Sequence, residues 1–133
     1  MKRKTVAIAI FKDKDKLLIQ DRKPWDSYGF EYGFFGGKLE PGESSEEAFK
    51  REIKEELGIN IKDYEFVKHT IKKIPNISLE VEFYVYLAPI PDMKELVCNE
   101  GKPFLTTVKN ALCLKMNPAD LEVLKEVKDL KCR

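Results

Sequence analysis

The chain has 133 residues, 43% of them hydrophobic, and its 24 Lys and Arg residues nearly balance 23 Asp and Glu residues, giving a net charge of +1. This length predicts one globular domain over residues 1–133, and a near-neutral chain offers no basic face for DNA. Because no apolar run approaches the ~20 residues of a membrane span and no targeting segment is visible, we expect a cytoplasmic protein without a membrane partner.

The N-terminal third predicts strands and a loop. Residues 6–11 and 17–21 are apolar stretches on either side of a charged turn, a pattern typical of a β-hairpin. Residues 22–30 form the following loop. Residues 32–35 predict a short aromatic strand that leads directly into Gly36-Gly37.

A helix is predicted over residues 44–57. Ser44 and Glu47 have the spacing of a capping box, in which each side chain accepts from the backbone of the other residue. Gly58 stands where a C-terminal cap glycine belongs.

The second half predicts two long extended segments and two helices. Residues 61–73 and 77–87 are mostly extended, and the alternation from Val81 to Leu87 has the period of a half-buried strand. Residues 89–103 are loop-rich. Short and terminal helices are expected at residues 108–114 and 118–131, the second opened by Asn117 as N-cap. The order strands, helix, strands, helix favours an α/β fold with a mixed sheet covered by helices.

Three glutamates of the first helix carry the strongest chemical signal. Glu52, Glu55 and Glu56 lie within about 100° of arc, directly after the glycine turn. Carboxylates this close repel one another unless a cation lies among them. Hard oxygen ligands of this kind suit Mg²⁺ or Mn²⁺ held together with substrate phosphates.

The apolar stripe of the same helix supports this interpretation. Phe49, Ile53 and Leu57 form the face that must pack on the core. Glu52 and Glu56 border that face, where a carboxylate loses solvation unless a cation compensates. The alternative is an ordinary solvated face stabilised by i,i+4 ion pairs with Lys and Arg.

The segment from Gly37 to Ile59 resembles the Nudix hydrolase signature. Gly37, five residues, Glu43, seven residues and then Arg-Glu-Ile-Lys-Glu-Glu-Leu-Gly-Ile match it at every defined position. Residues 32–38 are similar to the Trp-x-Phe-Pro-Gly-Gly-Lys run of MutT-like members, with Tyr32 and Phe35 as departures. The resemblance implies an α/β/α sandwich, a mixed β-sheet between helices, with the signature folded as loop-helix-loop.

The resemblance also implies Mg²⁺-dependent hydrolysis of a diphosphate linkage in a nucleoside diphosphate derivative, with Mn²⁺ as a substitute. Glu43 is expected outside the inner ligands, Arg51 orients the glutamates, and Lys38 faces the phosphates. The general base is open between Glu52, which we prefer, and Glu100 on a distant loop. The implied metal ligands are the carbonyl of Gly37 and the carboxylates of Glu52, Glu55 and Glu56.

Four residues are candidates for substrate binding, each with an ordinary structural alternative. Trp25 and Tyr32 could stack on a nucleobase or pack within the protein. Asn117 could read the base, cap the last helix, or do both. Arg22 could touch substrate or simply end its strand.

The expected substrate is a nucleoside triphosphate, including oxidised purine forms, cut to the monophosphate and pyrophosphate. ADP-ribose, nucleotide sugars and dinucleoside polyphosphates are alternatives within the same chemistry. A nucleotide-sensing module without turnover is a second class, and RNA-end processing is a third. A homodimer is compatible with the sequence.

Overall fold

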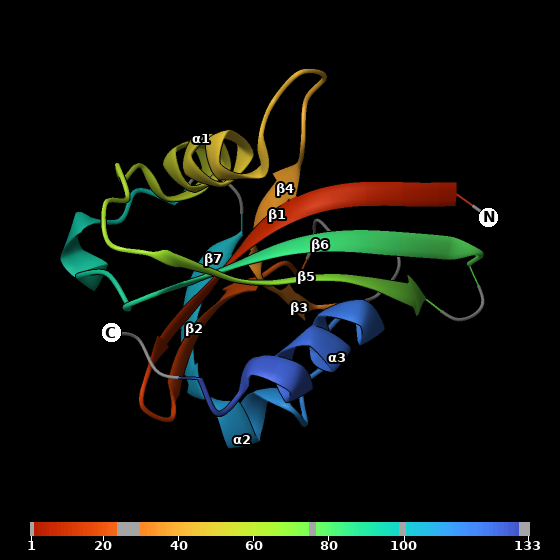
Figure 1. Cartoon of the computed structure of the whole chain (residues 1–133). Helices are drawn as coiled ribbons and strands as arrows, with labels where there is room; N and C mark the ends of the chain where they lie inside the picture. The colour runs from red at the N-terminus through yellow and green to blue at the C-terminus, as the bar shows by residue number, and fades with distance from the viewer. Residues whose placement is uncertain (1, 24–29, 75–76, 99–100, 131–133) are drawn as a thin grey trace.

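The computed structural model describes residues 2–23, 30–74, 77–98 and 101–130. Within these ranges lie seven strands, three α-helices, of which α2 is a single turn, and one short 3₁₀ segment (Figure 1). The strands are β1 Lys2–Asp13, β2 Lys16–Asp21, β3 Tyr32–Gly33, β4 Phe35–Lys38, β5 Glu65–Ile74, β6 Leu79–Ala88 and β7 Lys102–Thr107. The helical elements are α1 Ser45–Leu57, the 3₁₀ segment Met93–Glu95, the turn α2 Val108–Ala111 and α3 Pro118–Val127.

The long strand β1 organises the sheet. It pairs in parallel with β6, from Lys2 opposite Leu79 to Phe11 opposite Ala88, and antiparallel with β2 and β4. The strand order is β3-β2-β1-β6-β5, with β4 on β1 and β7 on β2. Residues 6–12 of β1 are all buried, because both faces of the strand are covered.

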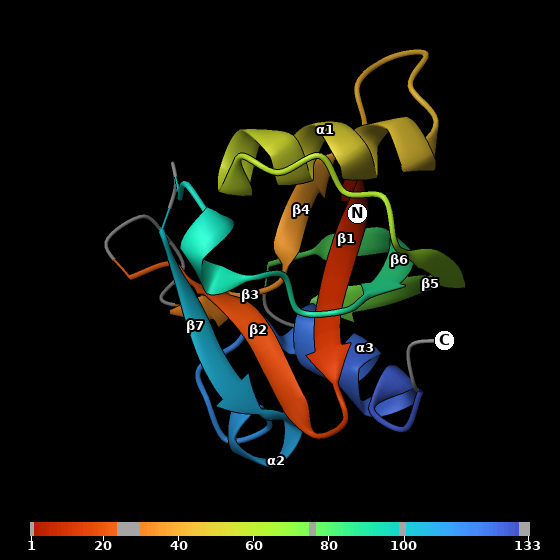
Figure 2. The ribbon, with the colours of Figure 1, turned by 90° about the vertical axis from the view of Figure 1, so that its left-hand side faces the viewer.

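Helices cover the two faces of the sheet, so the predicted α/β/α sandwich is confirmed. Figures 1 and 2 show α1 on one face and α3 on the other. Phe49, Ile53 and Leu57 of α1 pack on one apolar core, and Val123 and Leu124 of α3 on a second. No helix in the described ranges is long and apolar enough to cross a membrane.

The start of α1 follows the predicted capping box. The Ser44 hydroxyl accepts from the Glu47 N–H at 3.1 Å, and the Glu47 carboxylate accepts from the Ser44 N–H at 3.0 Å. Gly58 ends the helix in the left-handed conformation, at φ 71°. These caps fix where the helix begins, and therefore which residues face β4.

Several predicted boundaries were wrong. The aromatic strand at 32–35 is two strands, β3 and β4, separated at Phe34. The segment predicted to start at residue 61 becomes a strand only at Glu65, and α2 and α3 both end earlier than expected. The loop predicted over residues 89–103 runs into β7, which pairs with β2 along its length.

Strand β6 was predicted to be half-buried, and residues 79–84 follow that pattern, whereas residues 85–88 are all buried. Val81, Phe83 and Val85 face the α3 core, while Tyr86 and Ala88 face the α1 core. Glu82, one of the alternating polar residues that suggested an open face, is only partly buried, and Thr5 donates to its carboxylate at 2.8 Å. The alternating pattern therefore describes the first part of the strand correctly and fails for its last four residues.

Candidate active site

Two consecutive glycines of β4 let helix α1 approach the sheet. Gly36 has φ +137° and a Cβ there would collide with the Ala7 carbonyl oxygen, so only glycine is accommodated. At Gly37 a Cβ would lie 2.5 Å from Cδ of Glu52. The carboxylate of Glu52 therefore occupies the space that a side chain at residue 37 would fill.

Glu56 is buried against the same glycines, with 5% of its surface exposed. One carboxylate oxygen accepts from the Gly36 N–H at 2.8 Å, and the other accepts from Nε2 of Gln20 at 3.3 Å. Gln20 was not singled out from the sequence, because its position near the end of β2 carries no motif. Backbone and side-chain donors thus hold a buried carboxylate beside β4.

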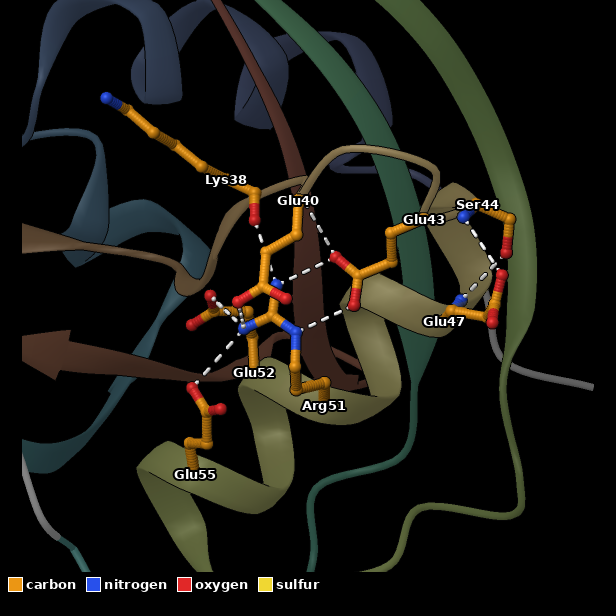
Figure 3. A network of polar contacts seen from close by, with 8 residues as sticks. All are labelled: Lys38, Glu40, Glu43, Ser44, Glu47, Arg51, Glu52 and Glu55. Atoms are coloured by element: carbon orange, nitrogen blue, oxygen red, sulfur yellow. Dashed lines mark hydrogen bonds and ion pairs between the residues drawn. The ribbon is translucent and has the colours of Figure 1, made fainter.

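The guanidinium of Arg51 forms a two-pronged contact with Glu43 (Figure 3). Nε donates to one oxygen of Glu43 at 2.7 Å and Nη2 to the other at 2.8 Å, and Nη2 also donates to the Lys38 carbonyl at 3.0 Å. These Arg51 hydrogen bonds, and after them one from the Glu40 backbone N–H, lower the pKa of Glu43 to about 2. Arg51 therefore ties the signature loop to the helix.

The remaining nitrogen of Arg51 faces the candidate ligands. Nη1 donates to Glu52 at 2.9 Å and to Glu55 at 3.4 Å. Hydrogen bonding to Glu43, and then to Glu52, raises the pKa of Arg51 above its already high ordinary value. Arg51 thus contacts Glu43, Glu52 and Glu55 at once, and its role in orienting the glutamates stays a prediction.

The donor set fits a hard divalent cation, although the carboxylates do not yet converge. Among the described residues, no three His, Cys, Asp or Glu side chains already form a metal-binding group. Glu52 and Glu55 turn their carboxylates toward Arg51, and Glu55 is 58% exposed, so its rotamer can change at low cost. Oxygen donors from Glu52, Glu55 and Glu56 beside Gly37 are of the type that Mg²⁺ and Mn²⁺ prefer.

Two further residues, Lys38 and Glu100, were predicted to be catalytic. The Lys38 side chain is exposed and points away from the Arg51 cluster in Figure 3, while its carbonyl accepts from Arg51. Glu100, the alternative general base, lies outside the described residues, as does Trp25. Their roles stay predictions.

A pocket of about 200 Å³ opens on the other side of the glycine pair. Gly36 and Gly37 line it, together with three of the predicted substrate-binding residues, Arg22, Tyr32 and Asn117. Tyr32 is 9% exposed and packs on Phe104 at 5.1 Å between ring centroids, so it is a wall of the pocket. Asn117 also caps α3, accepting from the Ala119 N–H at 2.8 Å.

Asp120 is a pocket residue that sequence reasoning missed. It resembled an ordinary acidic residue in the first turn of a helix. In the structure it lines the pocket and accepts from the Phe34 N–H at 3.3 Å. Burial raises the pKa of its carboxyl to about 6, despite that hydrogen bond and the nearby charges of Lys4 and Arg22.

Comparisons with known proteins agree with this arrangement. The model of the NUDIX domain family matches residues 1–127. A relative from Escherichia coli strain K12, a CTP pyrophosphohydrolase, is 29% identical over 126 residues, covering 93% of this chain and 90% of its own length.

Two solved structures share the fold over nearly the whole chain. A MutT NUDIX hydrolase from Burkholderia pseudomallei has a TM-score of 0.77 at 22% identity, with 96% of this chain and 99% of that chain covered. A MutT protein from Bacillus halodurans has a TM-score of 0.72 at 28% identity, with 96% and 84% covered.

The contact between Gly37 and Glu52 can be measured by a double-mutant cycle. Gly37→Ala places a methyl group on the Glu52 carboxylate, so we expect a loss of about 1–2 kcal/mol in the free energy of unfolding. In a Glu52→Ala background the same change should cost less than about 0.5 kcal/mol, since the clash is gone. Urea denaturation measures both, and an equal cost in the two backgrounds would contradict the contact.

The raised pKa of Asp120 predicts a pH-dependent stability. Between about pH 4 and pH 6 the native state binds more protons than the unfolded chain, so the free energy of unfolding falls as the pH rises through this window. Asp120→Asn removes the charge and keeps an acceptor for the Phe34 N–H. We expect the variant to be about 1–3 kcal/mol more stable than the parent at pH 8 and equal to it near pH 4.

Denaturation of both proteins at pH 4, 6 and 8 checks this expectation. A stability difference that does not change with pH would show that the carboxyl of Asp120 titrates normally in the folded protein.

Proposed function

The chain belongs to the NUDIX domain family, as a MutT-like pyrophosphohydrolase, and on this premise we propose that it uses Mg²⁺ to hydrolyse a nucleoside triphosphate to the monophosphate and pyrophosphate. Cytosine nucleotides are the first candidates and oxidised purine nucleotides the second. Mn²⁺ is expected to replace Mg²⁺.

One observation carries the proposal: the pocket and the carboxylate cluster share Gly36 and Gly37. These residues line the pocket on one side and contact Glu56 and Glu52 on the other. The pocket is smaller than the roughly 300–1,000 Å³ that encloses a whole ligand of nucleotide size. A base in the pocket would therefore leave its phosphates beside the glycine pair, within reach of the glutamates.

The residues of α1 and the glycine turn are proposed to bind the cation and the substrate phosphates. Glu52, Glu55, Glu56 and the Gly37 carbonyl would hold the cation, which when bound neutralises phosphate charge and lowers the pKa of water. Arg51 keeps Glu52 and Glu55 oriented through Nη1. Lys38 is proposed to counter charge that develops on the departing phosphate.

Glu52 is our candidate for the residue that removes the proton from the attacking water. Its carboxylate lies beside Gly37 and accepts from Nη1 of Arg51 at 2.9 Å, which holds it next to the proposed cation site. Glu100 is the alternative base. The two are distinguished by the substitution of each residue in turn.

One polar group of the pocket, the carboxylate of Asp120, favours a base with an exposed amino group. The carboxylate of Asp120 accepts hydrogen bonds, and an acidic side chain accepting from the N4 amino group is a recognised way to read cytosine. A uracil would instead present an oxygen to Asp120. The name of the curated relative, CTP pyrophosphohydrolase, agrees with this preference.

We expect Glu52→Gln to keep the fold, because the two side chains are nearly isosteric, and to lower kcat by roughly 10²–10⁴-fold. Pyrophosphate and phosphate release is measured with Mg²⁺ on CTP, dCTP, UTP, 8-oxo-dGTP, ADP-ribose, a nucleotide sugar and a dinucleoside polyphosphate. Glu122→Gln, on the exposed face of α3, is the matched control and should be unaffected.

Turnover of a nucleoside triphosphate that disappears in Glu52→Gln alone supports the proposal. Turnover only of ADP-ribose or a nucleotide sugar assigns the other substrate class. Binding of metal and nucleotide without turnover of any compound would contradict an enzymatic function and would indicate a nucleotide-sensing module. Near-normal activity of Glu52→Gln would remove Glu52 from both the ligand and the base roles.

A further inference from the structure

Gln20 is a buried amide in the part of the molecule where α1 packs on the sheet. It is 3% exposed, and Lys12, Gln20 and Glu56 are the buried polar or charged residues of the described chain. Gln20 lies two residues after Leu18 on β2, so the two side chains leave the same face of the strand. Leu18 packs in the α1 core, and a buried amide beside that core is costly unless it is hydrogen-bonded.

The amide of Gln20 is the second hydrogen-bond donor that holds the Glu56 carboxylate in place. The Gly36 N–H holds one oxygen at 2.8 Å, and Gln20 holds the other at 3.3 Å. The last torsion of a glutamate is broad and roughly two-fold, so one donor alone leaves the carboxylate plane poorly defined. A donor on each oxygen, from β4 and from β2, fixes that plane.

Gln20 is itself held in place by a close turn. Gly101 has φ +65°, and a Cβ there would lie 3.1 Å from Cγ and 3.3 Å from Nε2 of Gln20. The backbone at Gly101 therefore packs directly on the amide, immediately before β7 pairs with β2. This contact restricts the movement of the Gln20 side chain.

We infer that Gln20 is a positioning residue that sets the orientation of the Glu56 carboxylate for cation binding. The inference rests on the proposed function, because it requires that Glu56 bind a divalent cation. Gln20 touches neither substrate nor cation in this role. Groups that orient metal ligands typically change metal affinity by about 10–100-fold when they are replaced.

The test measures Mn²⁺ binding to the full chain without nucleotide, from the electron paramagnetic resonance signal of free Mn²⁺. Gln20→Met keeps the side-chain length and removes the donor, and we expect it to raise the Kd for Mn²⁺ about tenfold. Gln20→Asn keeps the amide but draws it back by one methylene, and it should weaken binding likewise. Leu18→Val is the matched control from the same strand face, expected to lower Tm while leaving the Kd within about twofold.

A Glu56→Ala background separates positioning from general damage. If Gln20 acts through Glu56, Gln20→Met should have no further effect on Mn²⁺ binding there. An unchanged Kd in both Gln20 variants, or an equal loss in Leu18→Val, would overturn the inference. Failure of the parent protein itself to bind Mn²⁺ would instead overturn the proposed metal dependence, and the inference with it.

Discussion

The close approach of α1 to β4 is the constraint on which the site depends. A sheet and a helix normally keep their side chains between them, but at Gly36 and Gly37 the strand presents only backbone. The space is filled by carboxylates instead, with Glu56 on the Gly36 N–H and Glu52 over Gly37. Two acidic groups are thereby placed at the rim of an apolar core, where water cannot fully stabilise them.

The guanidinium of Arg51 offsets part of the negative charge of the carboxylates at this rim. Arg51 bonds Glu43 through two nitrogens and reaches Glu52 and Glu55 with the third. The planar fork of an arginine suits this task, which a lysine could not perform with the same geometry. Arg51 therefore offsets part of the mutual repulsion of these carboxylates within the protein itself. The proposed cation would then compete with Arg51 for Glu52 and Glu55.

The sequence predicted those parts of the fold and site that depend on local spacing. The capping box at Ser44, the cap at Gly58 and the order of glutamates on α1 are all set by neighbours in the chain. Strand β7 was missed because its pairing with β2 joins residues more than 80 positions apart, and its own sequence begins with Lys102-Pro103 in a loop-rich stretch.

Asp120 and Gln20 were not predicted as site residues, because, as for β7, their contacts join distant parts of the chain. An aspartate in a first helical turn and a glutamine near the end of a strand have ordinary local explanations. Only the contacts of Asp120 with the Phe34 N–H and of Gln20 with Glu56 give them a second role. Arg22, Tyr32 and Asn117 line one pocket, and their roles in substrate binding stay predictions.

The position of the proposed cation is the property that a single measurement, paramagnetic broadening in NMR spectra, would locate most directly. Substoichiometric Mn²⁺ added to isotope-labelled protein broadens the amide signals nearest the bound ion. We expect the signals of Gly36, Gly37 and residues 52–56 to disappear first, while those of β5 and α3 persist. Broadening centred on another surface, or spread evenly over exposed carboxylates, would contradict the assignment of this glycine turn and helix as the metal site.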